Sequence, residues 1–121
     1  MILVDTSIWV DHLRVGNKTL AALLDAGRVL AHPFIIGELA LGELRQRDLV
    51  LETMRNLPQS GAATDEEVLH FIGRHRLFGS GIGYVDAHLL AAVRLSSATA
   101  LWTRDKRLLG VAERLGLAAV P

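Results

Sequence analysis

Hydrophobic positions along the chain fall into short continuous runs separated by longer stretches of helical periodicity. Continuous apolar runs are typical of strands that are buried on both faces. They occur at residues 2–4, 28–31, 98–102 and 117–120. Because such strands alternate here with helical stretches, the pattern predicts an α/β fold, with three layers (α/β/α) around a short, mostly parallel central sheet.

Apolar residues three or four positions apart predict the helices between these runs. The expected helices cover residues 7–14, 19–26, 33–45, 48–57, 65–75, 83–95 and 105–115. Their ends carry suitable signals, because Pro33 fits a first helical turn, Asp65 an N-cap, and Gly27 and Gly116 the C-terminal ends. No repeat, linker or low-complexity tract interrupts the pattern, so we expect one domain over residues 1–121.

Composition excludes several classes of protein. Half of the residues are hydrophobic, but acids interrupt every apolar run before the roughly 18 residues that a membrane span needs. No basic segment precedes the first apolar residues, as a secretory signal would require, and the absence of cysteine agrees with a cytoplasmic protein. The net charge of zero argues against non-specific coating of nucleic acid.

Two acids directly follow predicted strands. Asp5 ends "MILVD", and Asp105 comes just after "ATALWT", at the start of a predicted helix. Ligands of open α/β sheets bind outside the carboxyl ends of the strands, so both acids should face one crevice. Each also has a purely structural interpretation, since Asp105 suits an N-cap, worth about 1 kcal/mol, and Asp5 suits a turn.

A third acid lies within a predicted helix that is mostly apolar. In "HPFIIGELALGEL", Glu38 stands at helical spacing from Phe34, Ile35 and Leu41, whereas Glu43 can point to water. We therefore expect Glu38 to share a buried face. A carboxylate there requires a cation or a set of hydrogen-bond donors, because an unpaired buried charge is costly.

A fourth acid, Asp86, stands in "SGIGYVDAHLLAAV", which is apolar almost all round. It shares a stripe with Ile82, Leu89, Leu90 and Val93, so this helix should belong to the core. Burial would raise the pKa of the Asp86 carboxyl. The nearby helix N-terminus offsets at most about 2 kcal/mol of the cost, which predicts a cation close by.

These four acids give one consistent site if they converge on a hard cation. Carboxylate oxygens without thiolate or imidazole ligands suit Mg²⁺ or Mn²⁺. Such an ion lowers the pKa of bound water, orients it for in-line attack on a phosphodiester, and stabilises the leaving oxygen. The hydroxyls of Thr6, Ser7 and Thr103 stand beside the acids and suit a metal-bound water or a phosphate oxygen, or equally an N-cap or turn.

The segments "VDTSIWVDHL", "IIGELALGEL", "GIGYVDAHLLAA" and "LWTRDKRL", in this order, resemble the PIN-domain ribonucleases, and among them the VapC-like toxins of bacterial toxin–antitoxin pairs. The resemblance covers nearly the whole chain and implies a metal-dependent endoribonuclease with a metal-activated water as nucleophile. Its four acidic positions match Asp5, Glu38, Asp86 and Asp105, and its supporting threonine matches Thr103. Asp5, Asp86 and Asp105 are the expected metal ligands. A VapB-like antitoxin and a homodimer are implied as well.

Contacts to RNA phosphates must come from basic residues, and Arg104, Lys106 and Arg107 surround Asp105. A solvated helix face explains these three residues equally well. Trp9 and Tyr84 are available to stack on bases, as is Phe78, but we expect most aromatic side chains in the core.

Other motifs in the chain fit less well. Tyr84 breaks the G-x-G-x-x-G pattern of dinucleotide sites, and His70 and His75 lack the spacing of two zinc ligands on one helix face. His88 is expected to be a packing or surface residue rather than a general base. Two other functions remain open: a non-catalytic interaction module whose acids pair with arginines such as Arg104, and a signalling domain phosphorylated on an aspartate.

Overall fold

Three strands form one parallel sheet in the order β2–β1–β3, with β1 in the middle. A computed structural model describes residues 1–121. Its elements are β1 (Ile2–Val4), α1 (Thr6–Val15), α2 (Lys18–Asp25), β2 (Val29–Leu30), α3 (Pro33–Leu41), α4 (Arg47–Asn56), α5 (Asp65–Arg74), α6 (Tyr84–Leu95), β3 (Ala100–Trp102) and α7 (Lys106–Arg114).

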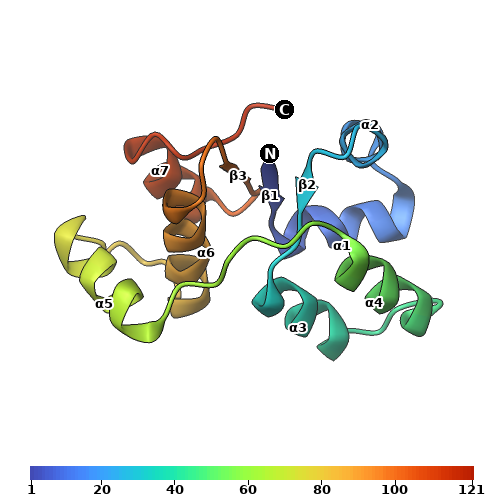
Figure 1. Ribbon diagram of the computed structural model, residues 1–121, viewed down its shortest axis with the longest axis horizontal. Coiled ribbons are helices and arrows are strands. Elements are labelled where there is room, and N and C mark those ends of the chain that lie inside the picture. Colours follow the sequence, from blue (N-terminus) through green and yellow to red (C-terminus); the bar gives the residue numbers. More distant parts are fainter.

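Helices cover the sheet from two sides, which confirms the predicted α/β fold with its layers. In Figure 1 the strands lie between α5, α6 and α7 on one side and α1 to α4 on the other. Helix α6 contacts β3 and α5, while α3 contacts α1 and α4. The segment between α4 and α5, residues 57–64, crosses from one group to the other (Figure 1). None of the helices combines the length and the apolar character that a membrane span requires.

The sheet is shorter at its edges than the apolar runs predict. Residues 117–120 form no strand and contribute a single parallel bridge, between Ala118 and Leu101. A matching bridge joins Gln59 to Ala31 at the opposite edge, where no apolar run predicts one. Edge residues of this kind pair through the backbone alone, so hydrophobic pattern is a poor guide to them.

Most helix ends lie within one residue of the prediction, but the end of α3 and the cap of α5 differ from it. Helix α3 stops at Leu41 rather than at residue 45, because Gly42 takes an extended conformation and ends the run. Thr64, not Asp65, caps α5: its side chain accepts from the N–H of Glu67, and the Glu67 carboxylate accepts from the N–H of Thr64. This reciprocal capping box leaves the Asp65 carboxylate free for another role.

The hydrophobic core is one cluster that runs from Ile2 to Leu117 in the chain. Helix α6 contributes most to it, since every residue from Ala87 to Val93 is buried. Its three alanines allow close approach on several sides. The single domain over residues 1–121 stays a prediction with which this continuous core agrees.

Candidate active site

Asp5 lies where β1 ends and α1 begins, as the sequence predicts, and it is only 8% exposed. Its backbone N–H donates to the carbonyl of Trp102 at 2.9 Å, which continues the β1–β3 pairing and holds Asp5 in place. The Oδ1 atom accepts from the N–H of Thr6 at 2.8 Å as an N-cap. Its Oδ2 accepts from the hydroxyl of Thr103 at 2.7 Å.

Thr103 joins the two acids that follow strands. Its buried hydroxyl donates to Asp5 and accepts from the backbone N–H of Asp105 at 3.1 Å. Asp105 caps α7, because its Oδ1 accepts from the N–H groups of Arg107 and Leu108. Both bonds use Oδ1, so Oδ2 stays available to a ligand. The capping interpretation and the ligand interpretation of Asp105 are therefore compatible.

This position is the switch point of the sheet. The chain leaves β1 for β2 on one side and returns to β3 on the other, so the connections diverge outside the carboxyl ends of β1 and β3. Ser7 lies there too, with its hydroxyl 3.5 Å from Oδ2 of Asp5 and 3.4 Å from the backbone nitrogen of Arg104. Asp5, Thr103 and Asp105 thus form one hydrogen-bonded group where the fold favours ligand binding.

Glu38 reaches this group from α3, but not from a buried face. The predicted face is wrong: Ile35 is buried, whereas Glu38 and Phe34 are exposed and Leu41 is 91% exposed. Helix α3 buries Ile35 and Leu39 and packs partly buried Ile36 against the core, which turns the Glu38 side toward solvent. The Thr6 hydroxyl donates to Oε1 of Glu38 at 2.6 Å and fixes its direction.

Asp86 is half-buried in the first turn of α6, and its Oδ2 accepts from the N–H of Gly83 at 3.1 Å. Burial raises the pKa of its carboxyl; the Gly83 bond acts in the opposite direction, and the negative charges of Asp5, Asp105 and Glu38 raise the pKa further. The structure therefore brings all four predicted acids into electrostatic contact around Asp86.

No arginine or lysine neutralises these four carboxylates. The ion pairs of the chain join Arg47 to Asp48 and Arg104 to Asp11, and His88 lies against Asp65. Arg104 therefore pairs with an acid outside the group, against the expectation of an interaction module whose acids bind arginines.

The donor set fits a hard divalent cation. Its ligands would be carboxylate and hydroxyl oxygens, and burial together with the charges of Asp5, Asp105 and Glu38 raises the pKa of Asp86. No three of these side chains stand close enough to form a closed ligand cage. Mg²⁺ needs no such cage, because it keeps several waters and binds through one or two carboxylates.

The predicted RNA-contacting residues lie on both sides of Asp105 and are exposed. Arg104 reaches α1, where its guanidinium pairs with Asp11. Arg107 covers the loop before α6, since a side-chain carbon at Gly81 would lie 3.0 Å from its Cδ. Gly81 has a φ of +86°, so no larger residue easily replaces it.

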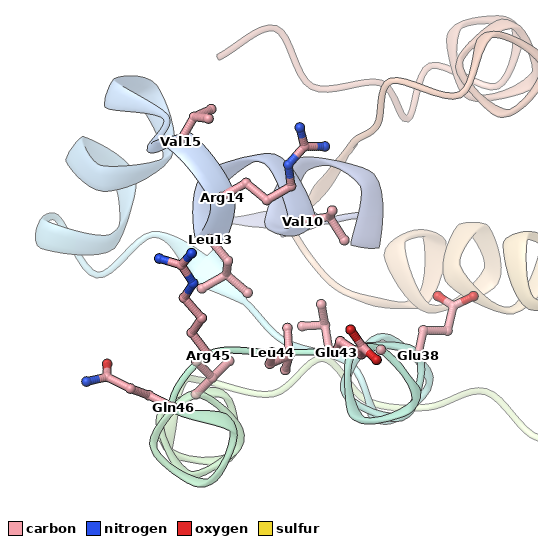
Figure 2. A pocket seen from close by; sticks show the side chains of 12 residues that line it. Val10, Leu13, Arg14, Val15, Glu38, Glu43, Leu44, Arg45 and Gln46 are labelled. Atoms are coloured by element: carbon pink, nitrogen blue, oxygen red, sulfur yellow. The ribbon is translucent and has the colours of Figure 1, made fainter.

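A groove of about 800 Å³ runs beside Glu38, between α1 and the α3–α4 pair. Figure 2 shows Val10 and Leu13 of α1 above Leu44, with Glu38 at one end and Arg45 at the other. The groove thus combines apolar walls with charged ends, and it borders the acidic group through Glu38.

Sequence reasoning missed a second polar group, centred on His88. This histidine is buried, and its Nε2 lies 3.2 Å from Oδ1 of Asp65, which also accepts from the hydroxyl of Tyr84 at 2.9 Å. Buried His32 begins α3, with its Nδ1 accepting from the N–H of Phe34. The sequence signal for this group was the presence of His32 and His88 among apolar residues. It did not reveal Asp65 and Phe34, the partners of His88, because these come from distant segments. Of the two expected roles of His88, packing or surface, the structure shows packing.

Comparisons with known proteins agree with this geometry. The sequence model of the PIN domain matches residues 2–114. Ribonuclease VapC32 of Mycobacterium tuberculosis, from strains CDC 1551 / Oshkosh and ATCC 25618 / H37Rv, is 49% identical over 118 residues, which is 98% of this chain and 95% of that protein.

Solved structures support the fold alone, because their identity is low. FitAB bound to an IR36 DNA fragment is 20% identical, with a TM-score of 0.60 over 93% of this chain and 91% of that chain. FitAcB from Neisseria gonorrhoeae is 21% identical, with a TM-score of 0.60 over 93% and 94%. By the match of residues 2–114 and the 49% identity across almost its full length, the chain belongs to the PIN-domain family, among its VapC-like members.

Proposed function

We propose that this chain is a metal-dependent endoribonuclease, the toxin of a toxin–antitoxin pair. The observation that carries the proposal is the convergence of Asp5, Glu38, Asp86 and Asp105 at the switch point without a neutralising arginine. The close relative named a ribonuclease supports the same activity.

Asp5, Asp86 and Asp105 are the residues that would hold Mg²⁺ or Mn²⁺. When bound, the ion supplies a water of lowered pKa and a positive charge for the leaving oxygen. Thr103 holds Asp5 and Asp105 in register through its two hydrogen bonds. Glu38 has Oε1 engaged by Thr6, which leaves Oε2 to accept a proton from the attacking water.

Arg104 and Arg107 would contact the RNA backbone on either side of the scissile bond, with Lys106 beside them. Asp11 holds Arg104 toward α1, and Arg107 lies against the loop that precedes α6. Two positioned guanidiniums fix the register of a phosphate backbone without reading its sequence.

The activity is tested with purified chain, single-stranded RNA and a Mg²⁺ titration. Cleavage should appear with the metal, stop with EDTA, and be lost in Asp5→Asn. A matched control is Asp25→Asn, at the end of α2 and far from the site in the chain, which should cut normally. Cleavage that persists in EDTA contradicts the proposal.

Two partners complete the proposal. A VapB-like antitoxin would lie in the groove beside Glu38, its apolar side chains against Val10 and Leu13, and so cover the acids. Leu13→Asp should then weaken inhibition by the antitoxin while leaving RNA cleavage intact. A homodimer is the second partner, and light scattering of the purified chain tests it. A monomeric mass would contradict it.

A further inference from the structure

Three of the six aromatic side chains of this protein are exposed, and they gather in one region. Trp9 and Phe71 are buried in the core. By contrast, Phe34 is 38%, Tyr84 47% and Phe78 69% exposed. Phe34 lies in the first turn of α3, while Phe78 and Tyr84 flank the glycine-rich loop before α6.

The rings of Phe34 and Tyr84 are held rigidly in spite of their exposure. Each lies 4.7 Å from the buried ring of His88, at interplanar angles of 63° and 88°. The hydroxyl of Tyr84 also donates to Asp65. His32 supports Phe34 on its other side, with ring centroids 5.2 Å apart. Edge-to-face contacts of this kind fix the direction of both rings.

Phe34 stands next to the acidic group, and Tyr84 lies near Phe34 because both rings pack on His88. Phe34 lies one helical turn before Glu38, on the same side of α3. Tyr84 comes two residues before Asp86 in the first turn of α6, so its ring points to a different side of the helix, toward His88. Tyr84 and Phe78 also line a hollow of about 220 Å³.

We propose that Phe34 and Tyr84 form a stacking platform for nucleobases of the RNA that flank the scissile phosphodiester. The inference rests on the proposed function, because it assigns a substrate contact to the same site. Every base has an apolar face that stacks on an aromatic ring, and single-stranded RNA exposes these faces. Rings that are already fixed lose little conformational freedom when a base stacks on them.

Arg107 favours RNA over an apolar protein partner at this platform, because its side chain lies against Gly81, three residues before Tyr84, and a guanidinium binds phosphate. Phe34 borders the acidic group through Glu38, where the phosphodiester of the substrate must lie for hydrolysis. The polar atoms beside them, the Tyr84 hydroxyl and Nε2 of His88, are already bound to Asp65. Only the apolar ring surfaces remain to be covered, as stacking by a base requires.

The test uses a short single-stranded oligoribonucleotide with 2-aminopurine, whose fluorescence falls when it stacks. Binding is measured in EDTA, where no cleavage is expected. Wild-type chain should quench the probe, and Phe34→Leu or Tyr84→Leu should each weaken binding by about tenfold. Tyr84→Phe keeps the ring and should retain quenching. Leu69→Ala, an exposed apolar side chain on α5, is the matched control and should bind as wild type does.

The outcomes separate this inference from the proposed function. A chain that cuts RNA with Mg²⁺ but does not quench the probe overturns the stacking platform and leaves the ribonuclease intact. Quenching lost in the leucine variants supports the platform even if no cleavage is seen. Unchanged quenching with an altered molecular mass in those variants overturns it and assigns the two rings to contact with a second copy.

Discussion

Helices α3 and α6 each carry one acid of the site, but they hold it in opposite ways. Seven consecutive residues of α6 are buried, and Asp86 sits half-buried at its start with a backbone donor. Helix α3 buries only Ile35 and Leu39, and exposed Glu38 depends on a hydroxyl from α1. Helix α6 therefore fixes its acid by packing, whereas α3 depends on a hydrogen bond from another helix.

The two helices therefore show two separate requirements of an active-site acid: its charge must be tolerated, and its side chain must point in one direction. A carboxylate in a packed helix keeps its place but resists ionisation, as the raised pKa of Asp86 indicates. A carboxylate on an open helix needs a hydrogen bond to point in one direction. We expect Asp86 to dominate metal binding and Glu38 to tune the chemistry.

The largest expected effect comes from neutralising the two acids separately. Asp86→Asn should lower RNA cleavage by at least about 10²-fold, as removal of a charge-stabilising active-site group does. It should also raise the melting temperature without metal, because it removes repulsion by three neighbouring acids. Glu38→Gln should leave stability within about 0.5 kcal/mol. Equal melting shifts in both variants would remove the distinction between the helices.

Metal binding should stabilise the fold through Asp86 rather than through Glu38. At a free Mn²⁺ concentration of 100 times Kd, the free energy of unfolding should rise by about 2.7 kcal/mol. Calorimetry should find this rise in wild type and Glu38→Gln, and lose most of it in Asp86→Asn. Stabilisation that survives in Asp86→Asn would place the ion elsewhere.

Acid should loosen the start of α3 before it affects α6. Burial, together with the charge of His88, lowers the pKa of His32 to about 4. The unfolded chain, with a histidine pKa near 6.5, therefore binds the proton first, and stability falls as pH drops from about 6.5 toward 4. The expected loss is of the order of 2 kcal/mol. Urea unfolding across this range measures it, and His32→Asn, which keeps a capping acceptor, should show a shallower slope.

The smallest expected effect concerns the hydroxyl that orients Glu38. Thr6→Val removes that donor and should lower cleavage about threefold to tenfold, the value of one hydrogen bond, with little change in stability. Thr6→Ser keeps the donor and should restore the rate. If Thr6→Val cuts RNA as fast as wild type, the bond is incidental.

Periodicity and motif order predicted much of this molecule. The buried strands at residues 2–4 and around 29 and 101 are confirmed, as are the PIN-domain family and the helical layers. Asp5 and Asp105 lie after strands as expected, because a parallel sheet brings the carboxyl ends of its strands to one edge. The catalytic roles of the four acids stay predictions.

Local pattern was a weaker guide wherever a distant segment supplied the partner. Glu38 was assigned to a buried face because its neighbours are apolar, but no element covers that side of α3. The bridge at Ala118 and the His88–Asp65–Tyr84 group likewise depend on residues far apart in sequence.

Chain order and side-chain chemistry therefore settled which elements form and which acids stand at their ends, because hydrophobic spacing and capping act within a few residues. Tertiary packing decided which faces stay open, which hydroxyl meets which carboxylate, and that four acids share one region without an arginine. Burial and electrostatic interaction depend on distances in space, which spacing along the chain does not specify.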